Sequence, residues 1–217
     1  MTTASSEIWT KLWREIGTKD DGLAVYQELV SLYSEPHRQY HNLHHIAQCL
    51  SEFDSARHLA RHPLAVELAI WFHDAIYDPR ASDNEEKSAE LAEKRISQAG
   101  GDEYLFASVS SLVLATKPPH GRSAHGDAPL ISDVDLSILG KPEARFWEYE
   151  AQIRREYDWV PEAIFATKRA EILQQFLARE RIYSTKHFFG RYEEQARLNL
   201  QASVQKLKSR PWYKKLL

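Results

Sequence analysis

The chain has 217 residues, of which 43% are hydrophobic and 27% are charged, and its formal net charge is −3. This length and balance predict one globular domain with a hydrophobic core. The slightly negative charge argues against an extended nucleic-acid-binding surface but leaves room for a small basic pocket.

Apolar residues spaced three and four apart predict helices along most of the chain. The predicted helical segments are residues 21–34, 43–60, 64–78, 83–100, 102–116, 143–159, 161–183 and 192–209. Asn42 is placed to cap the second segment and Pro63 to open the third. Alternating strand patterns are nearly absent, so we expect an all-α fold of eight to ten helices, arranged as a single domain over residues 1–217.

The single cysteine, Cys49, excludes a disulfide framework within the chain, and we expect it to be a small buried residue on its helix. No stretch approaches the roughly 20 apolar residues that span a bilayer, and the first residues lack the pattern of a signal peptide. These features predict a cytoplasmic protein without a membrane partner.

Histidines are concentrated in the first part of the chain, with nine of the ten lying between residues 37 and 125. One of them, His73, stands beside Asp74 in the apolar run "WFHDAIYDP". Burying an imidazole and a carboxylate costs several kcal/mol unless each finds a partner. Taken alone, the pair is most often a satisfied polar pair, but a divalent cation is the other partner that would accept both.

Two further features complete a candidate metal site. "YHNLHHI" supplies a histidine near residue 45, and "SDVDLSILG" supplies an aspartate near residue 135, which we expect at the start of a helix. Imidazoles and carboxylates together suit zinc, manganese, iron, cobalt or nickel. Ligands carried on separate helices can converge in a helical bundle.

The order His, His-Asp, Asp in "YHNLHHI", "WFHDAIYD" and "SDVDLSILG" resembles the HD-domain superfamily of metal-dependent phosphohydrolases. Together with "DNEEKSA", these stretches are similar to a mostly uncharacterised branch of predicted HD phosphohydrolases. "EILQQFLARERIY" and "ARLNL" extend the resemblance to roughly residues 7–205. It implies an HD-type helical domain with the metal site within residues 37–140 and the helices of residues 141–210 completing the bundle.

The resemblance implies four metal ligands, which are His45, His73, Asp74 and Asp135. The alternatives left open are His41, with His44 ranked third, for the first histidine, and Asp133 for the last aspartate. The cation would be divalent: Mn, Mg, Co, Ni, Zn or Fe. Two-metal relatives carry additional histidines before the final aspartate, where this chain has only His120 and His125, so one cation is favoured.

The implied activity is hydrolysis of a nucleotide or another small phosphoester by a metal-activated water. Asp74 and His73 would be the catalytic residues. The substrate-binding candidates are Lys117, His120, Arg38 and His41. The alternatives are an HD-type di-iron oxygenase and a nucleotide-binding sensor module without turnover; a homodimer is left open.

Overall fold

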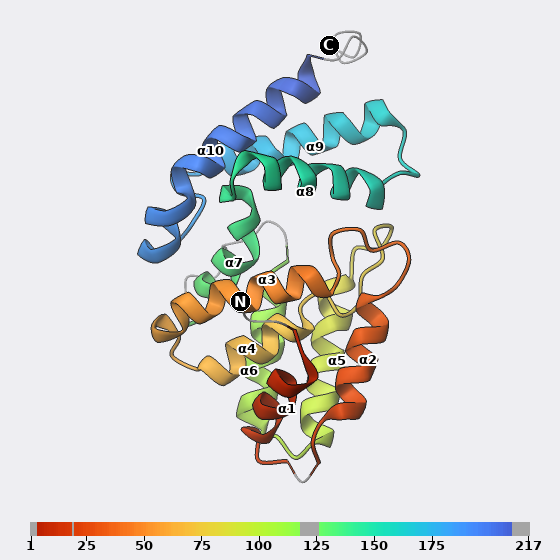
Figure 1. The fold of residues 1–217 in the computed structure, drawn as a ribbon, viewed down its shortest axis with the longest axis vertical. Coiled ribbons are helices and arrows are strands. Elements are labelled where there is room, and N and C mark those ends of the chain that lie inside the picture. The colour runs from red at the N-terminus through yellow and green to blue at the C-terminus, as the bar shows by residue number, and fades with distance from the viewer. Residues whose placement is uncertain (1–3, 19, 118–125, 210–217) are drawn as a thin grey trace. The chain divides into compact units, whose positions relative to one another are not determined.

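The structure is a computed structural model that describes residues 4–18, 20–117 and 126–209 (Figure 1). The chain forms two compact units, Met1–Asp135 and Leu136–Leu217. The expectation of one domain over the whole chain stays a prediction.

The expectation of an all-α fold with eight to ten helices is confirmed, because the described residues form ten α-helices, two short 3-10 helices and no strand. The first unit contains α1 (Ser6–Arg14), α2 (Leu23–Tyr33), α3 (Leu43–Ala56), η1 (Arg57–Leu59), α4 (Pro63–Phe72), α5 (Asn84–Gln98), α6 (Glu103–Leu114) and α7 (Ala128–Asp135). The second contains η2 (Leu136–Gly140), α8 (Glu143–Glu156), α9 (Glu162–Leu177) and α10 (Lys186–Lys208).

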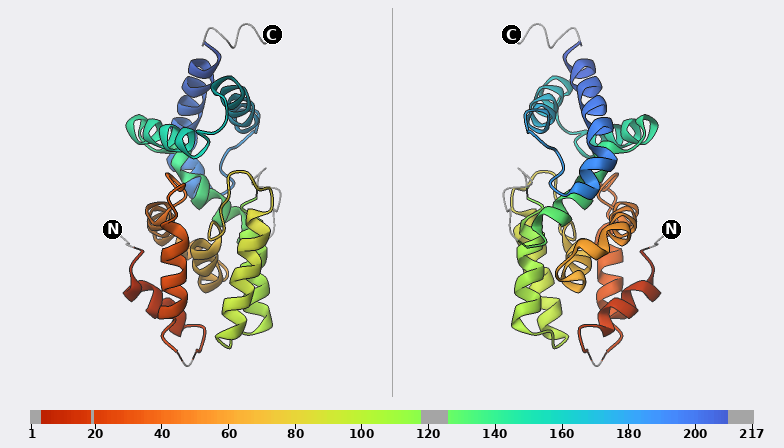
Figure 2. Two further views of the ribbon diagram at one scale, coloured as in Figure 1. Left: turned by 90° about the vertical axis from the view of Figure 1, so that its right-hand side faces the viewer. Right: turned by 90° about the vertical axis from the view of Figure 1, so that its left-hand side faces the viewer.

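Helix α4 is the buried centre of the first unit, since every residue from Ala65 to Phe72 is buried. It packs against α1, α3, α5, α6 and α7, and α5 and α6 run side by side next to it (Figure 2). Trp9 of α1 stacks on Trp13 with ring centroids 5.0 Å apart and meets Trp71 edge-on at 5.2 Å. This aromatic cluster fixes the end of α4 that carries the His-Asp pair.

Two caps set where α3 and α4 begin. The side chain of Asn42 accepts a hydrogen bond from the backbone N–H of His44, as the sequence predicts. The buried carboxylate of Asp127 accepts from the backbone N–H groups of Arg61 and His62, each at 2.8 Å, just before Pro63 opens α4. The residue directly before α7 therefore anchors the segment that leads into α4.

Helix α4 ends at Phe72, six residues before the predicted end at residue 78. Beyond it the backbone N–H of Ala75 donates to the carbonyl of Phe72 in a tight turn. The hydroxyl of Tyr33 donates to the carbonyl of Trp71 at 2.9 Å, so a distant side chain replaces the next helical bond. His73 and Asp74 consequently lie at the helix end rather than within its regular spiral.

Helix α9 likewise ends early, at Leu177, and α10 starts before its predicted first residue. The carboxylate of Glu193 accepts from the backbone N–H groups of Ile182 and Tyr183, which removes them from any helical ladder. Thr185 then caps α10 by accepting from the N–H of Phe188. Long-range hydrogen bonds again override a periodic sequence pattern.

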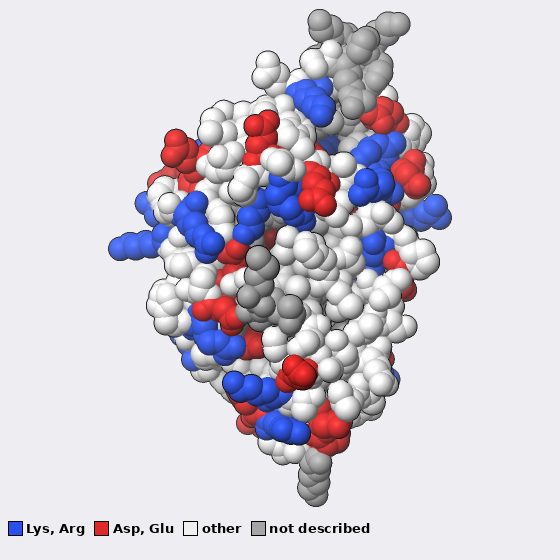
Figure 3. Space-filling model, viewed as in Figure 1, with Lys and Arg blue, Asp and Glu red and all other residues white. Residues whose placement is uncertain are grey.

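Within the described residues, no helix combines the length and apolar character needed to cross a bilayer. On the face in Figure 3, Lys and Arg side chains are interspersed with Asp and Glu rather than gathered into one stripe.

Two glycines of the second unit predict opposite changes in stability. A Cβ on Gly140 would lie 2.5 Å from the Cβ of Tyr192 and 2.8 Å from its backbone oxygen, whereas a Cβ on Gly190 within α10 meets nothing within 4 Å. We expect Gly140→Ala to destabilise the fold by about 1–3 kcal/mol through overpacking. Gly190→Ala should instead stabilise it by about 0.5–1 kcal/mol, because alanine favours the helix.

Thermal unfolding of both variants against the parent chain tests this pair. Equal melting temperatures for Gly140→Ala and the parent chain would contradict the close packing of η2 on α10.

Candidate metal centre

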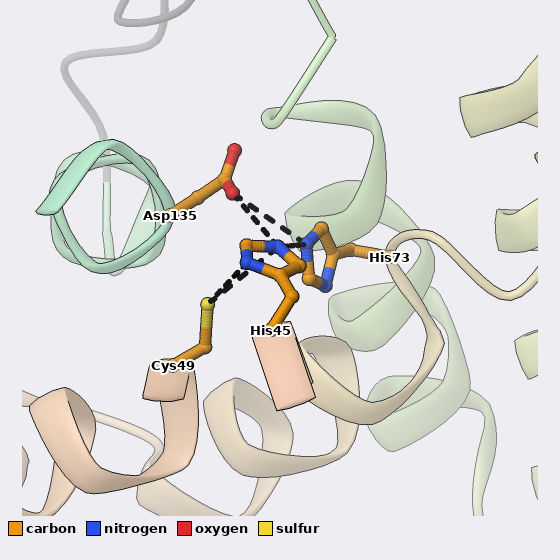
Figure 4. Close-up of side chains that lie close together, drawn as sticks. All are labelled: His45, Cys49, His73 and Asp135. Atoms are coloured by element: carbon orange, nitrogen blue, oxygen red, sulfur yellow. Dashed lines mark hydrogen bonds and ion pairs between the residues drawn. The ribbon is translucent and has the colours of Figure 1, made fainter. Parts of the chain in front are cut away.

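The turns of α3, α4 and α7 that face one another bring three predicted ligands together (Figure 4). His45 comes from the first turn of α3, His73 directly follows α4, and Asp135 is the last residue of α7. The Nε2 atoms of His45 and His73 lie 3.2 Å apart. Asp135 Oδ1 lies 3.3 Å from His45 Nε2 and 3.7 Å from His73 Nε2.

Asp74 joins the same group from the turn after α4. Its Oδ2 lies 3.2 Å from His73 Nε2 and 3.4 Å from His45 Nε2. An unbroken helix would separate the side chains of adjacent residues by about 100°. His73 keeps a helical backbone at the C-cap of α4, and its imidazole Nε2 nevertheless lies 3.2 Å from Asp74 Oδ2 in the turn that follows.

The spacing between the two imidazole nitrogens, and from each of them to the two carboxylates, fits a shared cation. Atoms bound to one metal ion at about 2.0–2.2 Å lie about 2.8–3.6 Å from one another, depending on the coordination number. The five separations given above run from 3.2 to 3.7 Å. The donor set of imidazoles and carboxylates could therefore hold a metal ion.

The imidazole of His73 is held in an orientation suited to ligation. Its Nδ1 forms a 2.9 Å hydrogen bond with the carbonyl of Ile70, which can only accept. Nδ1 must then carry the hydrogen, and Nε2 is left to present its lone pair to a cation.

Exposure within the group is uneven. The side chains of His45 and His73 are 1% and 3% exposed, whereas those of Asp74 and Asp135 are 20% and 19% exposed. The imidazoles thus form the closed side of the centre, and solvent reaches it beside the carboxylates.

The two imidazoles hold protons tightly when no cation is bound. Burial lowers the pKa of His45, but Cys49, Tyr40 and the nearby carboxylates raise it more, so the net pKa lies well above its usual value. Burial also lowers the pKa of His73, yet the charge of Asp74 and hydrogen bonds to both carboxylates again raise the net value.

The two carboxylates change in the opposite direction. Burial raises the pKa of Asp74, but the positive charge of His73 and hydrogen bonds from both imidazoles hold the net pKa well below its usual value. Burial raises the pKa of Asp135, but the same two imidazoles lower it by more, so its net pKa lies below the usual value. The carboxylates therefore stay negative and attract positive charge, either protons on the imidazoles or a cation.

Arg38, predicted to bind substrate, is buried beneath the turn that carries Asp74. Its Nη1 donates to the carbonyls of Asp74 at 2.7 Å and His41 at 3.1 Å, and its Nη2 donates to the carbonyl of Ala75 at 2.8 Å. Its Nε donates to Glu35 at 2.9 Å. In this arrangement Arg38 positions Asp74 through its backbone, while a role in substrate binding stays a prediction.

The alternative histidines lie differently from His45. His41 stacks on Tyr77 with ring centroids 4.3 Å apart, and its ring centroid lies 5.9 Å from that of His45. His44 is exposed on α3, where its Nε2 contacts Gln48. The Nε2 of His45 lies 3.4 Å from Asp74 Oδ2 and 3.3 Å from Asp135 Oδ1.

Asp135 ends α7, so the expectation that these aspartates start a helix is wrong. Asp133 is buried two residues earlier, about 200° around the helix from Asp135. The paired Oδ1 contacts with both imidazoles belong to Asp135.

The remaining substrate-binding candidates are Lys117 and His120. Lys117 forms an ion pair with Glu86 at the start of α5 and donates to the carbonyl of Ser82 at 3.0 Å. His120 and His125 lie outside the described residues.

Cys49 is a neighbour of the centre that our sequence reasoning missed. It is buried, and its Sγ belongs with donor atoms of His45, His73 and Asp135 in a group whose members all lie within 4.8 Å of one another (Figure 4). The available signal was the spacing of four residues between His45 and Cys49, which places both on one face of α3.

Comparison with protein-family models, with curated proteins and with solved structures found no match for this chain.

The raised imidazole pKa values predict that cation binding depends on pH. His45 and His73 keep their protons until the pH exceeds their folded-state pKa values, and ligation requires neutral imidazoles. Affinity should therefore rise with pH by at least about tenfold per unit, one factor of ten for each displaced proton, and level off above those pKa values.

Calorimetric titration of the metal-free chain in buffers of different ionisation enthalpy measures the displaced protons. We expect at least one proton released per cation; release of none would contradict the protonated state of the imidazoles.

Arg38→Lys tests the positioning role of Arg38. A lysine ammonium cannot make all the hydrogen bonds that the planar guanidinium of Arg38 donates to Glu35 and to the carbonyls of His41, Asp74 and Ala75. The backbone of Asp74 should therefore lose its fixed position. We expect cation affinity to fall about 10–100-fold, as for other partners that orient a ligand. The exposed Arg14, changed to Lys, is the matched control.

Metal titration with circular dichroism as a folding check separates the two roles of Arg38. Unchanged cation affinity with a higher KM would instead assign Arg38 to substrate binding.

Proposed function

We propose that this chain is a metal-dependent phosphohydrolase of the HD superfamily that acts on a nucleotide or another small phosphoester. The observation that carries the proposal is the convergence of His45, His73, Asp74 and Asp135, in the chain order that motivated the resemblance. Each imidazole Nε2 lies 3.2–3.7 Å from the other Nε2 and from a carboxylate oxygen of each aspartate.

A catalytic centre is favoured over a purely structural one by the exposure of the carboxylates. Structural metal sites are closed by their protein ligands, whereas catalytic sites keep an open side. Here the side chains of Asp74 and Asp135 are 20% and 19% exposed beside two nearly inaccessible imidazoles. That side is where water and a phosphoester would enter.

The bound divalent cation would lower the pKa of a water molecule and neutralise charge on the phosphoryl group. The chain's own residues would position these participants. The His73 imidazole, held by Ile70, points its Nε2 inward, and the Oδ2 of Asp74 faces both imidazoles. The other carboxylate oxygen of Asp74 would accept the proton of the attacking water.

A small substrate fits the charge of the chain better than a polymer does. The net charge is −3, and cationic side chains are interspersed with acidic ones on the face in Figure 3. Lys117 would contribute to phosphate binding by exchanging its Glu86 partner for a phosphate oxygen. His41, which stacks on Tyr77 and has its ring centroid 5.9 Å from that of His45, would contribute to substrate binding beside the ligand set.

His73→Ala tests the proposal directly. Loss of one of the two imidazole donors should lower the amount of bound metal and reduce the rate of hydrolysis by about 100-fold or more. This loss exceeds the one typical for a residue that orients a ligand without binding the metal itself. His58→Ala, an exposed histidine on η1, is the matched control and should keep both properties. The measurements are metal content by elemental analysis and phosphate release from a panel of phosphorylated metabolites.

Three results would contradict the proposal. Full metal content in His73→Ala would remove the cation from this site. Two irons per chain would favour an HD-type di-iron oxygenase. Tight nucleotide binding without product from any member of the panel would favour a sensor module.

A further inference from the structure

A cavity of about 240 Å³ lies between α8, α9 and α10, and every residue that lines it belongs to the second unit. Its lining residues recur three and four apart along each of the three helices, which places them on one face of each helix. None of the residues of the metal centre lines this second-unit cavity. It is therefore a feature that the proposed function does not use.

The apolar part of the second-unit cavity sets the size of what it could hold. Four apolar side chains line it, those of Trp147, Ala151, Phe165 and Leu207. A cavity of about 150 Å³ holds a benzene molecule, whereas drug-sized ligands occupy pockets of about 300 Å³ or more. The volume of the second-unit cavity thus fits a single ring with a short substituent.

The carboxylates that line the cavity are already paired. Glu150 accepts hydrogen bonds from Arg169 Nη2 at 2.5 Å and from the hydroxyl of Ser203 at 2.8 Å. Glu162 accepts from Arg154 Nε at 3.1 Å. A cationic ligand would have to displace one of these arginines or lie beside it, so the lining favours an anion.

Lys206 supplies the charge that an anion would meet. Its Nζ lies 4.2 Å from the centroid of the Trp147 ring, and this cation–π contact holds the ammonium at the cavity wall. Within the described residues the ammonium forms no ion pair with a carboxylate. Since Arg154 and Arg169 are each paired with a glutamate, Lys206 leaves one positive charge over at the cavity.

We propose that the second-unit cavity binds a small carboxylate that carries one aromatic ring. The carboxylate group pairs with the Nζ of Lys206 through a charge-assisted hydrogen bond, and the ring packs against Phe165 and Leu207. One negative charge on the ligand balances the one positive charge that the lining leaves over.

Phenylacetate is the probe, because it joins one ring to a carboxylate through a single methylene. The full-length chain is titrated with it and followed by proton–nitrogen NMR. The indole N–H of Trp147 donates to Glu143 at 3.1 Å, and its signal, assigned from its loss in Trp147→Phe, reports on the cavity wall. We expect this signal to shift saturably with a Kd at or below about 10 mM, the weakest value usual for a ligand of about ten non-hydrogen atoms.

Two further compounds separate charge from ring. Benzylamine has the same ring and methylene but carries an ammonium, and acetate has the carboxylate without the ring. Each should bind about tenfold more weakly than phenylacetate or not at all.

Two variants separate the charge of the lining from its space. Lys206→Gln removes the positive charge and should weaken phenylacetate binding about tenfold or more. Ala151→Phe, at an exposed position, keeps Lys206 but fills the cavity and should abolish binding. The exposed Lys186→Gln at the start of α10 is the matched control and should bind like the parent chain, with circular dichroism as the folding check.

Three results would overturn the inference. The first is the absence of a saturable shift up to about 10 mM phenylacetate. The second is benzylamine binding as tight as that of phenylacetate. The third is unchanged phenylacetate affinity in folded Lys206→Gln. None of these results depends on metal binding, so the inference and the proposed function can fail separately.

Discussion

Two imidazoles and two carboxylates lie close together where α3, α4 and α7 meet. The arrangement of these helices around them depends on the balance of positive and negative charge among the four side chains. His45 and His73 are nearly inaccessible to water, so an unpaired charge on either would cost several kcal/mol. Each Nε2 faces an oxygen of Asp74 and of Asp135. The carboxylates require positive charge nearby, which protons on the imidazoles or a cation can supply.

The surrounding fold is arranged to hold this group in place. The hydroxyl of Tyr33 donates a hydrogen bond to the carbonyl of Trp71, and the guanidinium of Arg38 donates to the carbonyls of Asp74 and Ala75. Because these side chains occupy the carbonyls, α4 ends and a turn begins where the His-Asp pair starts. Neither contact is made by a metal ligand. The geometry of the His-Asp pair thus depends on two buried side chains, Tyr33 and Arg38, that lie far from the pair in sequence.

Much of this could be predicted from sequence. Helical periodicity gives the all-α class, and His73–Asp74 in an apolar run marks a buried polar pair that needs a partner. The end of α4 could not be predicted, because it depends on Tyr33 and Arg38 rather than on local propensity. The sequence predicts Cys49 as a buried thiol, and its spacing of four residues from His45 is the signal that places it beside the centre.

The central claim is that one cation is bound between His45 and His73. Anomalous diffraction from crystals of the chain grown with Mn²⁺ and, separately, with Zn²⁺ tests it most directly. The account predicts one strong peak within bonding distance of both Nε2 atoms and of the carboxylates of Asp74 and Asp135. No peak there, or a peak bound only by other residues, would contradict it.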